Sequence, residues 1–161
     1  MERGEVPDFL SDTLGFNLDR VSNLFHLELM RALADYGLTP EQWQIMALLW
    51  HNTGPLKQQD IAQLLLKDKH NVSRMVRRLE VKGWLERTPD PRSRALFIRP
   101  TELGRRYKDG VLRALSAHFS ALELGLSQSQ RQELVALLKT VRAHLSDGQT
   151  TFNAKKDLKA G

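Results

Sequence analysis

Hydrophobic residues recur every three or four positions through most of this chain, which is the spacing of one buried helical face. This period predicts helices over residues 14–36, 40–50, 57–66, 68–83, 102–124 and 127–145. Between residues 83 and 102, the period of the hydrophobic residues falls to two. Residues 84–88 and 95–99 are typical of strands. The turn-forming segment P-D-P-R-S-R joins these strands as a hairpin. The chain is therefore expected to be mainly α with a small β-hairpin, an α+β fold.

The helix predicted at residues 68–83 has two different faces. Asp68 is a good N-cap, and Gly83 stands where a helix commonly ends. The apolar face contains Val72, Met75, Val76 and Leu79. The opposite face presents His70, Asn71, Ser73, Arg74, Arg77 and Arg78. Arginine and asparagine can form base-specific hydrogen bonds in a DNA major groove, although a solvated basic surface is a common alternative.

The neighbouring elements favour DNA binding. The helix at 57–66 is separated from the basic helix by a short turn at Lys67 and Asp68, which is the helix-turn-helix arrangement. A hairpin directly after such a pair is a wing, and its prolines suit a hairpin tip or an edge rather than a central strand. The order of elements therefore predicts a winged helix-turn-helix.

Composition narrows the class of protein. The chain has 161 residues, of which 41% are hydrophobic and 27% charged, as is ordinary for a globular domain. No apolar run approaches the length of a membrane span, and the N-terminus lacks a signal-peptide pattern, so a cytoplasmic location is expected. The absence of cysteine excludes disulfides, thiolate metal ligands and a thiol-based redox switch.

The positive charge of the chain is concentrated in one block. The net charge is +5. Residues 55–104 contain 11 lysines and arginines against 6 aspartates and glutamates, whereas the rest of the chain has 13 of each sign. The whole net charge therefore lies in the block that contains the basic helix, which is the pattern expected of a phosphate-binding module.

Motifs for catalysis are not found in the sequence. It has no nucleophile elbow, no glycine-rich phosphate loop and no H-E-x-x-H segment. The five histidines lie far apart, and no two of them are four residues apart on a predicted helix. We therefore predict neither an enzyme nor a cofactor or metal site.

Five segments in order resemble MarR-family transcriptional regulators. They are L-T-P-E-Q-W-Q-I-M-A-L-L at 38–49, Q-Q-D-I-A at 58–62, D-K-H-N-V-S-R-M-V-R-R-L-E-V-K-G-W-L-E-R at 68–87, P-D-P-R-S-R at 89–94 and T-E-L-G-R at 101–105. The resemblance extends over residues 15–146. It implies a winged helix-turn-helix protein that binds double-stranded DNA as a two-fold homodimer, with intertwined N- and C-terminal helices.

The resemblance also divides the chain into functional parts. They are an N-terminal arm at 1–13, dimerisation helices at 14–37 and 102–146, and a winged helix-turn-helix DNA-binding domain at 38–101. The polar, lysine-rich segment 147–161 is expected to be a disordered tail. The leucine content of the flanking helices agrees with this division, because one subunit alone would expose a wide apolar surface.

Carried onto this sequence, the family's DNA contacts fall on the recognition helix, the helix before it and the wing. The expected contacts are Gln58, Gln59, Lys69, His70, Asn71, Ser73, Arg74, Arg77, Arg78, Arg92 and Arg94, with Asp90 steadying the wing through a basic neighbour. The chain departs from the family where Ser93 separates the two wing arginines, so which of them enters the minor groove stays open. It also has Leu66 where many members have glycine before the recognition helix, and Lys57 where a serine or threonine cap is usual.

Members of the family often respond to a small aromatic or anionic ligand bound between the dimerisation helices and the winged domain. The candidate lining residues are His26, Trp43, Met46, Trp50 and Phe119. Such residues at helical spacing are more often plain core, and Trp43, Met46 and Trp50 are expected on the buried face of their helix. The predicted function is a repressor that binds a pseudopalindromic operator as a homodimer and is released by such a ligand. The alternative is a winged-helix architectural DNA binder, or a protein-interaction module, with no ligand response.

Overall fold

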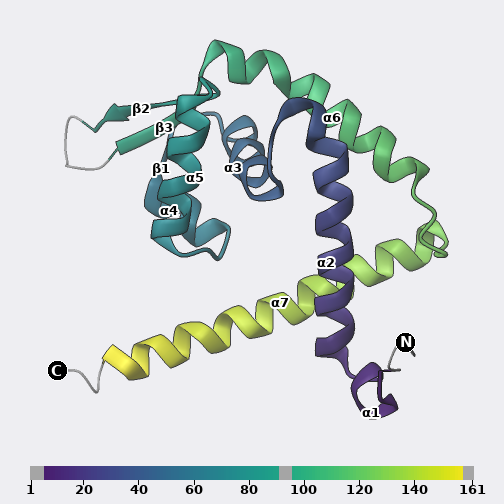
Figure 1. Ribbon diagram of the computed structural model, residues 1–161. Helices are drawn as coiled ribbons and strands as arrows, with labels where there is room; N and C mark the ends of the chain where they lie inside the picture. The colour runs from purple at the N-terminus through teal and green to yellow at the C-terminus, as the bar shows by residue number, and fades with distance from the viewer. Residues whose placement is uncertain (1–5, 91–95, 158–161) are drawn as a thin grey trace, which may run out of the picture. The chain divides into compact units, whose positions relative to one another are not determined.

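The computed structural model describes residues 6–90 and 96–157, with side chains as far as residue 146 (Figure 1). Its elements are α1 (Asp8–Ser11), α2 (Leu14–Leu33), η1 (Ala34–Tyr36), α3 (Pro40–His51), β1 (Leu56–Lys57), α4 (Gln58–Leu64), α5 (Lys69–Val81), β2 (Leu85–Pro89), β3 (Leu96–Pro100), α6 (Glu102–Ala121) and α7 (Gln128–Asp157). The chain forms two compact units, the first ending at Ser120 and the second beginning at Ala121. The expected fold class, mainly α with a small β wing, is confirmed.

Local sequence explains where two of the helices begin. Thr39 Oγ1 accepts the Gln42 N–H at 3.3 Å, and Gln42 Oε1 accepts the Thr39 N–H at 3.1 Å, so the capping box predicted before α3 is present. Pro40 occupies the first helical position, where its missing N–H would have no partner. Ser127 and Gln130 form the same reciprocal pair before α7, at 3.3 and 2.8 Å.

The sheet has three antiparallel strands in the order β1–β3–β2. β2 and β3 form the predicted hairpin, with Glu86 opposite Arg99 and Arg87 opposite Ile98. No sequence pattern predicts β1, whose two residues pair with Ile98 and Phe97. A strand of this length has no period to detect, so only its pairing with β3 defines it.

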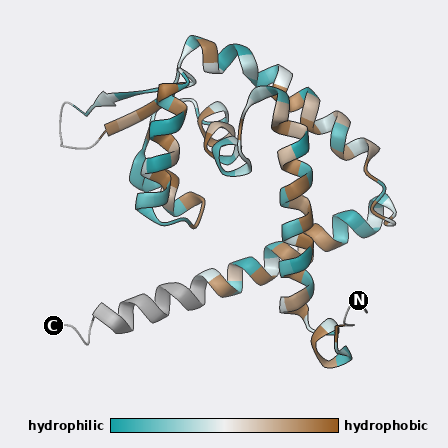
Figure 2. Ribbon diagram, viewed as in Figure 1, coloured by the Kyte–Doolittle hydropathy of each residue, from teal (hydrophilic) through white to brown (hydrophobic). Residues whose placement is uncertain are grey.

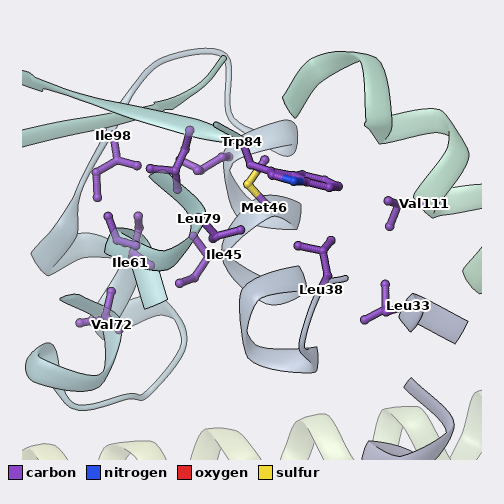
Figure 3. Close-up of a cluster of buried hydrophobic side chains, with 14 of the residues drawn as sticks. Leu33, Leu38, Ile45, Met46, Ile61, Val72, Leu79, Trp84, Ile98 and Val111 are labelled. Carbon is purple, nitrogen blue, oxygen red and sulfur yellow. The ribbon is translucent and has the colours of Figure 1, made fainter. Parts of the chain in front are cut away.

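The hydrophobic core of the first unit is formed by α3, α4, α5 and the sheet, together with Leu33 of α2 and Val111 of α6 (Figure 3). Its fully buried members include Ile45, Met46, Ile61, Val72, Val76, Leu79 and Ile98. The expectation that α3 buries Trp43 and Trp50 is only partly met, because both are half-buried whereas Ile45 and Leu49 are buried. α3 contacts α2, α5 and β3. A helix surrounded in this way is apolar on several sides, so its period does not identify the most buried face.

Gly104 permits a very close approach between α6 and the residue before β2. A Cβ atom at this position would lie 2.0 Å from the carbonyl oxygen of Trp84. Trp50 Nε1 donates to the Gly104 carbonyl at 3.0 Å, and Thr101 Oγ1 accepts the Gly104 N–H at 3.1 Å. Thr101 Oγ1 also donates to the Gly83 carbonyl at 2.5 Å. The T-E-L-G segment is therefore a packing joint that connects α6 with α3 and with the turn after α5.

The second unit is mainly α7. This helix does not end near Leu145 as predicted but continues to Asp157, into the segment expected to be disordered. No proline interrupts the chain there, and the single glycine at position 148 costs a helix only about 1 kcal/mol. Polar composition alone therefore does not locate the end of the helix.

Hydrophobic residues recur along α2 and along the coloured part of α7 (Figure 2). Several of their side chains are exposed. They are Val21, Leu24, Leu27 and Met30 on α2, and Leu134, Val135, Leu137, Leu138 and Leu145 on α7. Single exposed apolar residues are ordinary, but a row along one helix is typical of a surface that another chain or element covers.

Candidate nucleic-acid interface

The basic helix α5 begins at a well-formed cap. The Asp68 carboxylate accepts the backbone N–H of His70 at 2.8 Å and that of Asn71 at 3.3 Å. These two hydrogen bonds, together with the nearby positive charges, hold the pKa of Asp68 below its ordinary value of 3.8. The carboxylate is therefore ionised at neutral pH, where it complements the positive end of the helix.

The two faces predicted for α5 are present in the structure. Val72, Val76 and Leu79 are completely buried. The opposite face exposes Lys69, His70, Asn71, Arg74, Arg77 and Arg78, while Ser73 is half-buried at its edge. Arg74 donates a hydrogen bond to Asn71 Oδ1, so the side chain types suited to guanine and to adenine lie together on this face.

Two cavities, of about 550 and 470 Å³, lie between α5 and the first turn of α3. Both are lined by Thr39, Gln42, Arg74 and Arg78; the first adds Lys67 and Asn71, and the second adds Arg77 and Lys82. No sequence pattern places the capping residues of α3 beside this face, because only the core brings α3 and α5 together. Lys67 and Lys82 are not among the predicted DNA contacts, although their position at the two ends of the basic helix was a usable signal.

Leu66 occupies the turn before α5 in a left-handed backbone conformation, with φ at +51°. Glycine adopts this conformation without strain, whereas a residue with a Cβ does not. The Leu66 side chain is 64% exposed, so burial does little to compensate. This is the position where the sequence departs from the glycine common in the family that it resembles.

Lys57 braces the base of the wing. Its Nζ lies 3.4 Å from Asp90 Oδ2 and 5.4 Å from the centre of the Phe97 ring. The Asp90 side chain is only 9% exposed. This ion pair supports the role expected of Asp90, with Lys57 as the basic neighbour. The backbone N–H of Lys57 donates to Asp60 Oδ2 at 3.3 Å, so a carboxylate inside α4 satisfies a free donor at the start of this helix.

The remaining expected DNA contacts belong to α4 and to the wing. Gln58 and Gln59 are the first two residues of α4, and the first is half-buried while the second is exposed. Arg92 and Arg94 lie outside the described residues. The structure therefore places Gln59 at the surface next to the base of the wing and leaves the wing arginines as predictions.

An ion pair joins α5 to the wing. Arg87 of β2 donates to Glu80 Oε2 of α5, and the two side chains are 29% and 32% exposed. This hydrogen bond lowers the pKa of Glu80 and raises the pKa of Arg87. Both groups are therefore charged at neutral pH, and the pair connects α5 with β2.

The structure does not bring the five expected effector residues together around one described cavity. Met46 is fully buried in the core. Trp43 and Trp50 are half-buried, with ring centroids 6.1 Å apart. Phe119 stacks on another phenylalanine at 5.9 Å, and His26 Nδ1 lies 3.7 Å from a glutamate oxygen. Each of these side chains thus has a packing or pairing role within a single chain.

Among the described residues, 6–90 and 96–157, no group of three or more histidine, aspartate or glutamate side chains is arranged to hold a metal ion. None of the helices in this part of the chain is both long and apolar enough to cross a membrane.

Comparison with known proteins gives a consistent set of relatives. Residues 36–95 match the family model of the MarR family. YkoM of Bacillus subtilis (strain 168), an uncharacterised HTH-type transcriptional regulator, is 29% identical over 116 residues, which are 71% of this chain and 75% of YkoM.

Two similar structures contain DNA. The transcriptional repressor CouR from Rhodococcus jostii RHA1, solved with a 23-mer duplex, is 27% identical with a TM-score of 0.79, over 86% of this chain and 99% of CouR. Reduced AbfR of Staphylococcus epidermidis bound to DNA is 25% identical with a TM-score of 0.69, over 85% of this chain and 95% of AbfR. The fold described above is therefore one that is known in complexes with duplex DNA.

Proposed function

Because this chain belongs to the MarR family of winged-helix, DNA-binding transcriptional regulators, we propose that it recognises a specific operator through the outer face of α5. Arg74, Arg77 and Asn71 contact base edges in the major groove. The further contacts, to phosphates or in the minor groove, are made by Gln58, Gln59, Lys69, His70, Ser73, Arg78, Arg92 and Arg94.

The observation that carries this proposal is the construction of α5. Its basic and amide side chains stand on a helix whose opposite face is completely buried. The Asp68 cap fixes one end of this helix, and the Glu80–Arg87 ion pair connects the other end to the wing. Both devices hold α5 in place, and base recognition requires side chains on a rigid element.

The proposed binding unit is a homodimer. Support comes from the rows of exposed apolar side chains on α2 and α7, which are the helices expected to intertwine. A two-fold dimer places its recognition helices about 34–36 Å apart, so the operator is a pseudopalindrome with half-sites about 10 bp apart.

The protein is proposed to act in the cytoplasm as a repressor, by binding an operator that overlaps a promoter. CouR, one of the similar proteins, is described as a repressor and has also been solved with p-coumaroyl-CoA. By analogy, a small aromatic or anionic ligand releases this protein from DNA. Such release requires that the ligand binds the DNA-incompetent conformation more tightly than the DNA-bound one.

The test is fluorescence anisotropy with a labelled duplex from the promoter upstream of the protein's own gene. The experiment uses a NaCl titration and a random duplex as competitor. We expect tight binding that survives the competitor and weakens steeply with salt, because phosphate contacts release counterions. The variant Arg74→Ala/Arg77→Ala should lose this binding, whereas Arg106→Ala, an exposed arginine of α6, should retain it.

Two results would contradict the proposal. Equal binding to both duplexes would indicate an architectural DNA binder without sequence preference. A lack of binding to either duplex would indicate that the basic face contacts another protein.

A further inference from the structure

The turn before α5 contains a leucine at a position where the backbone favours glycine. The N–H of Leu66 donates to the Gln63 carbonyl at 3.2 Å, and the N–H of Lys67 donates to the Ala62 carbonyl at 2.9 Å. These two hydrogen bonds are those of a Schellman motif, which ends a helix with one residue in the left-handed conformation. Leu66 is that residue, with φ at +51°. The end of α4 therefore explains the backbone conformation at this position but not the leucine side chain.

The side chain of Leu66 contributes little to the core. It is 64% exposed, whereas the neighbouring Leu65 is half-buried and packs against the core. The apolar contact that often accompanies a Schellman motif involves the residue after the left-handed one, which here is Lys67. Backbone strain that local packing does not offset is found preferentially at functional sites. The leucine is therefore better explained by a contact with another molecule than by the fold of this chain.

Leu66 lies beside the side chains that are proposed to read DNA bases. It lines the cavity of about 550 Å³ together with Asn71 and Arg74. It comes two residues before Asp68, the N-cap of α5, and the N-terminal part of a recognition helix is the part that contacts base edges. The other apolar residue among the described lining residues, Met75, is half-buried. Leu66 therefore presents the exposed apolar group of a surface that is otherwise polar.

We propose that Leu66 is a specificity-determining residue, whose side chain contacts the C5-methyl group of a thymine in each half-site of the operator. Such a contact rests on the proposed function, because it requires α5 to lie in a major groove. The thymine methyl is the apolar group that the bases present in that groove, whereas a phosphate offers nothing to a leucine side chain. Leu66 thus selects thymine at one position, beside the bases that Asn71 and Arg74 recognise through hydrogen bonds.

The test uses deoxyuridine, which lacks the methyl group of thymidine and keeps all of its base-pairing groups. The full-length wild type first selects its preferred sequence from a library of random duplexes. Each thymine of the selected half-site is then replaced by uracil, and fluorescence anisotropy measures the affinity. We expect one position at which the change lowers wild-type affinity about fourfold in one half-site and about 15-fold in both, the effect of removing one buried methyl group from each.

Matched variants assign the methyl contact to Leu66. Leu66→Gly removes the side chain together with the backbone strain, and it should bind the thymine and uracil duplexes equally. Leu66→Met keeps an apolar side chain of similar volume and should still prefer thymine about twofold or more. The control is Leu64→Gly, the same change at an exposed leucine that does not line the cavity, and it should discriminate as the wild type does. Comparing two duplexes within each variant cancels any general effect on folding or affinity.

Two results would overturn the contact between Leu66 and thymine. One is a wild-type affinity that no uracil replacement changes. The other is a Leu66→Gly variant that still distinguishes thymine from uracil, since another side chain would then touch the methyl group. In both cases the wild type still prefers its selected duplex to a random one, so the proposed function stands. A library from which no sequence is enriched would contradict the proposed function, and the thymine contact with it.

Discussion

At the scale of single residues, Leu66 has backbone strain that its exposed side chain does not offset. Its φ of +51° is the left-handed conformation, which costs a residue with a Cβ about 1–2 kcal/mol. Replacement by glycine removes that cost but adds about 0.5–1 kcal/mol of chain entropy lost on folding. We therefore expect Leu66→Gly to raise the free energy of unfolding by about 0.5–1 kcal/mol, measured by urea denaturation.

Leu64→Gly is the matched control for this prediction. Leu64 is similarly exposed, at 58%, but ends the right-handed helix α4. Glycine there should lower the free energy of unfolding by about 1 kcal/mol. A loss of similar size in both variants would show that the turn gains nothing from glycine.

Arg74 tests base recognition at the same scale. It is exposed on the outer face of α5 and bonded to Asn71. If it contacts a base, Arg74→Ala should lower affinity for the operator by about 1–3 kcal/mol and change affinity for random duplex much less. Anisotropy titrations with both duplexes measure the difference. Equal loss on both would mean that Arg74 contacts only phosphates.

At the scale of elements, the N-cap of α5 gives a pH-dependent stability. The pKa of Asp68 is lowered from 3.8 in the folded protein, so the ionised carboxylate stabilises the fold at pH values above about 4. That contribution is lost as the pH falls through the lowered pKa. Asn in this position still caps the helix but does not titrate.

We therefore expect Asp68→Asn to be less stable than the wild type at pH 7 and equal to it at low pH. Melting temperatures measured by circular dichroism at several pH values from 7 to about 2 provide the test. A difference that stays constant over this range would mean that the charge of Asp68 does not contribute. The other carboxylates titrate in both proteins and cancel in the comparison.

The joint between α6 and the turn before β2 depends on Gly104. A Cβ placed 2.0 Å from a backbone carbonyl oxygen cannot be accommodated by moving a side chain. Gly104→Ala should therefore lower the free energy of unfolding by about 3 kcal/mol. Gly15→Ala is the control, because nothing lies within 4 Å of its Cβ and it stands in α2. The free energy of unfolding of Gly15→Ala should rise by about 0.5–1 kcal/mol. An equal decrease of the free energy of unfolding in both variants would exclude the proposed clash.

At the scale of the whole molecule, the exposed apolar rows predict self-association. Leu24 on α2 and Leu137 on α7 are 61% and 57% exposed. A stable dimer typically buries about 1,200–2,000 Å², which surfaces of this kind can supply. We expect sedimentation to show a dimer at micromolar concentration, and Leu24→Glu/Leu137→Glu to shift it toward monomer. Val81→Glu, at the exposed end of α5, should remain dimeric, and a monomeric wild type would contradict the dimer.

Features encoded over short distances were predictable from the sequence. The period of apolar residues located α3, α5 and the hairpin, and the caps at Thr39, Asp68 and Ser127 are where their side-chain chemistry requires them. These features depend on neighbours within one or two helical turns, so a sequence pattern is sufficient to detect them. The far end of α7 was predicted wrongly because helix length also depends on surroundings that composition does not report.

What the sequence alone determined about this protein is therefore its elements, its resemblance to the MarR family and the basic face of α5. The tertiary structure decided which distant residues meet. It paired β1 with β3, placed the first turn of α3 beside α5, and joined Lys57 to Asp90. It also gathered Arg99, Arg105 and Lys108 around one cavity with Trp50. These contacts arise from packing around a shared core, and no local period in the chain specifies them.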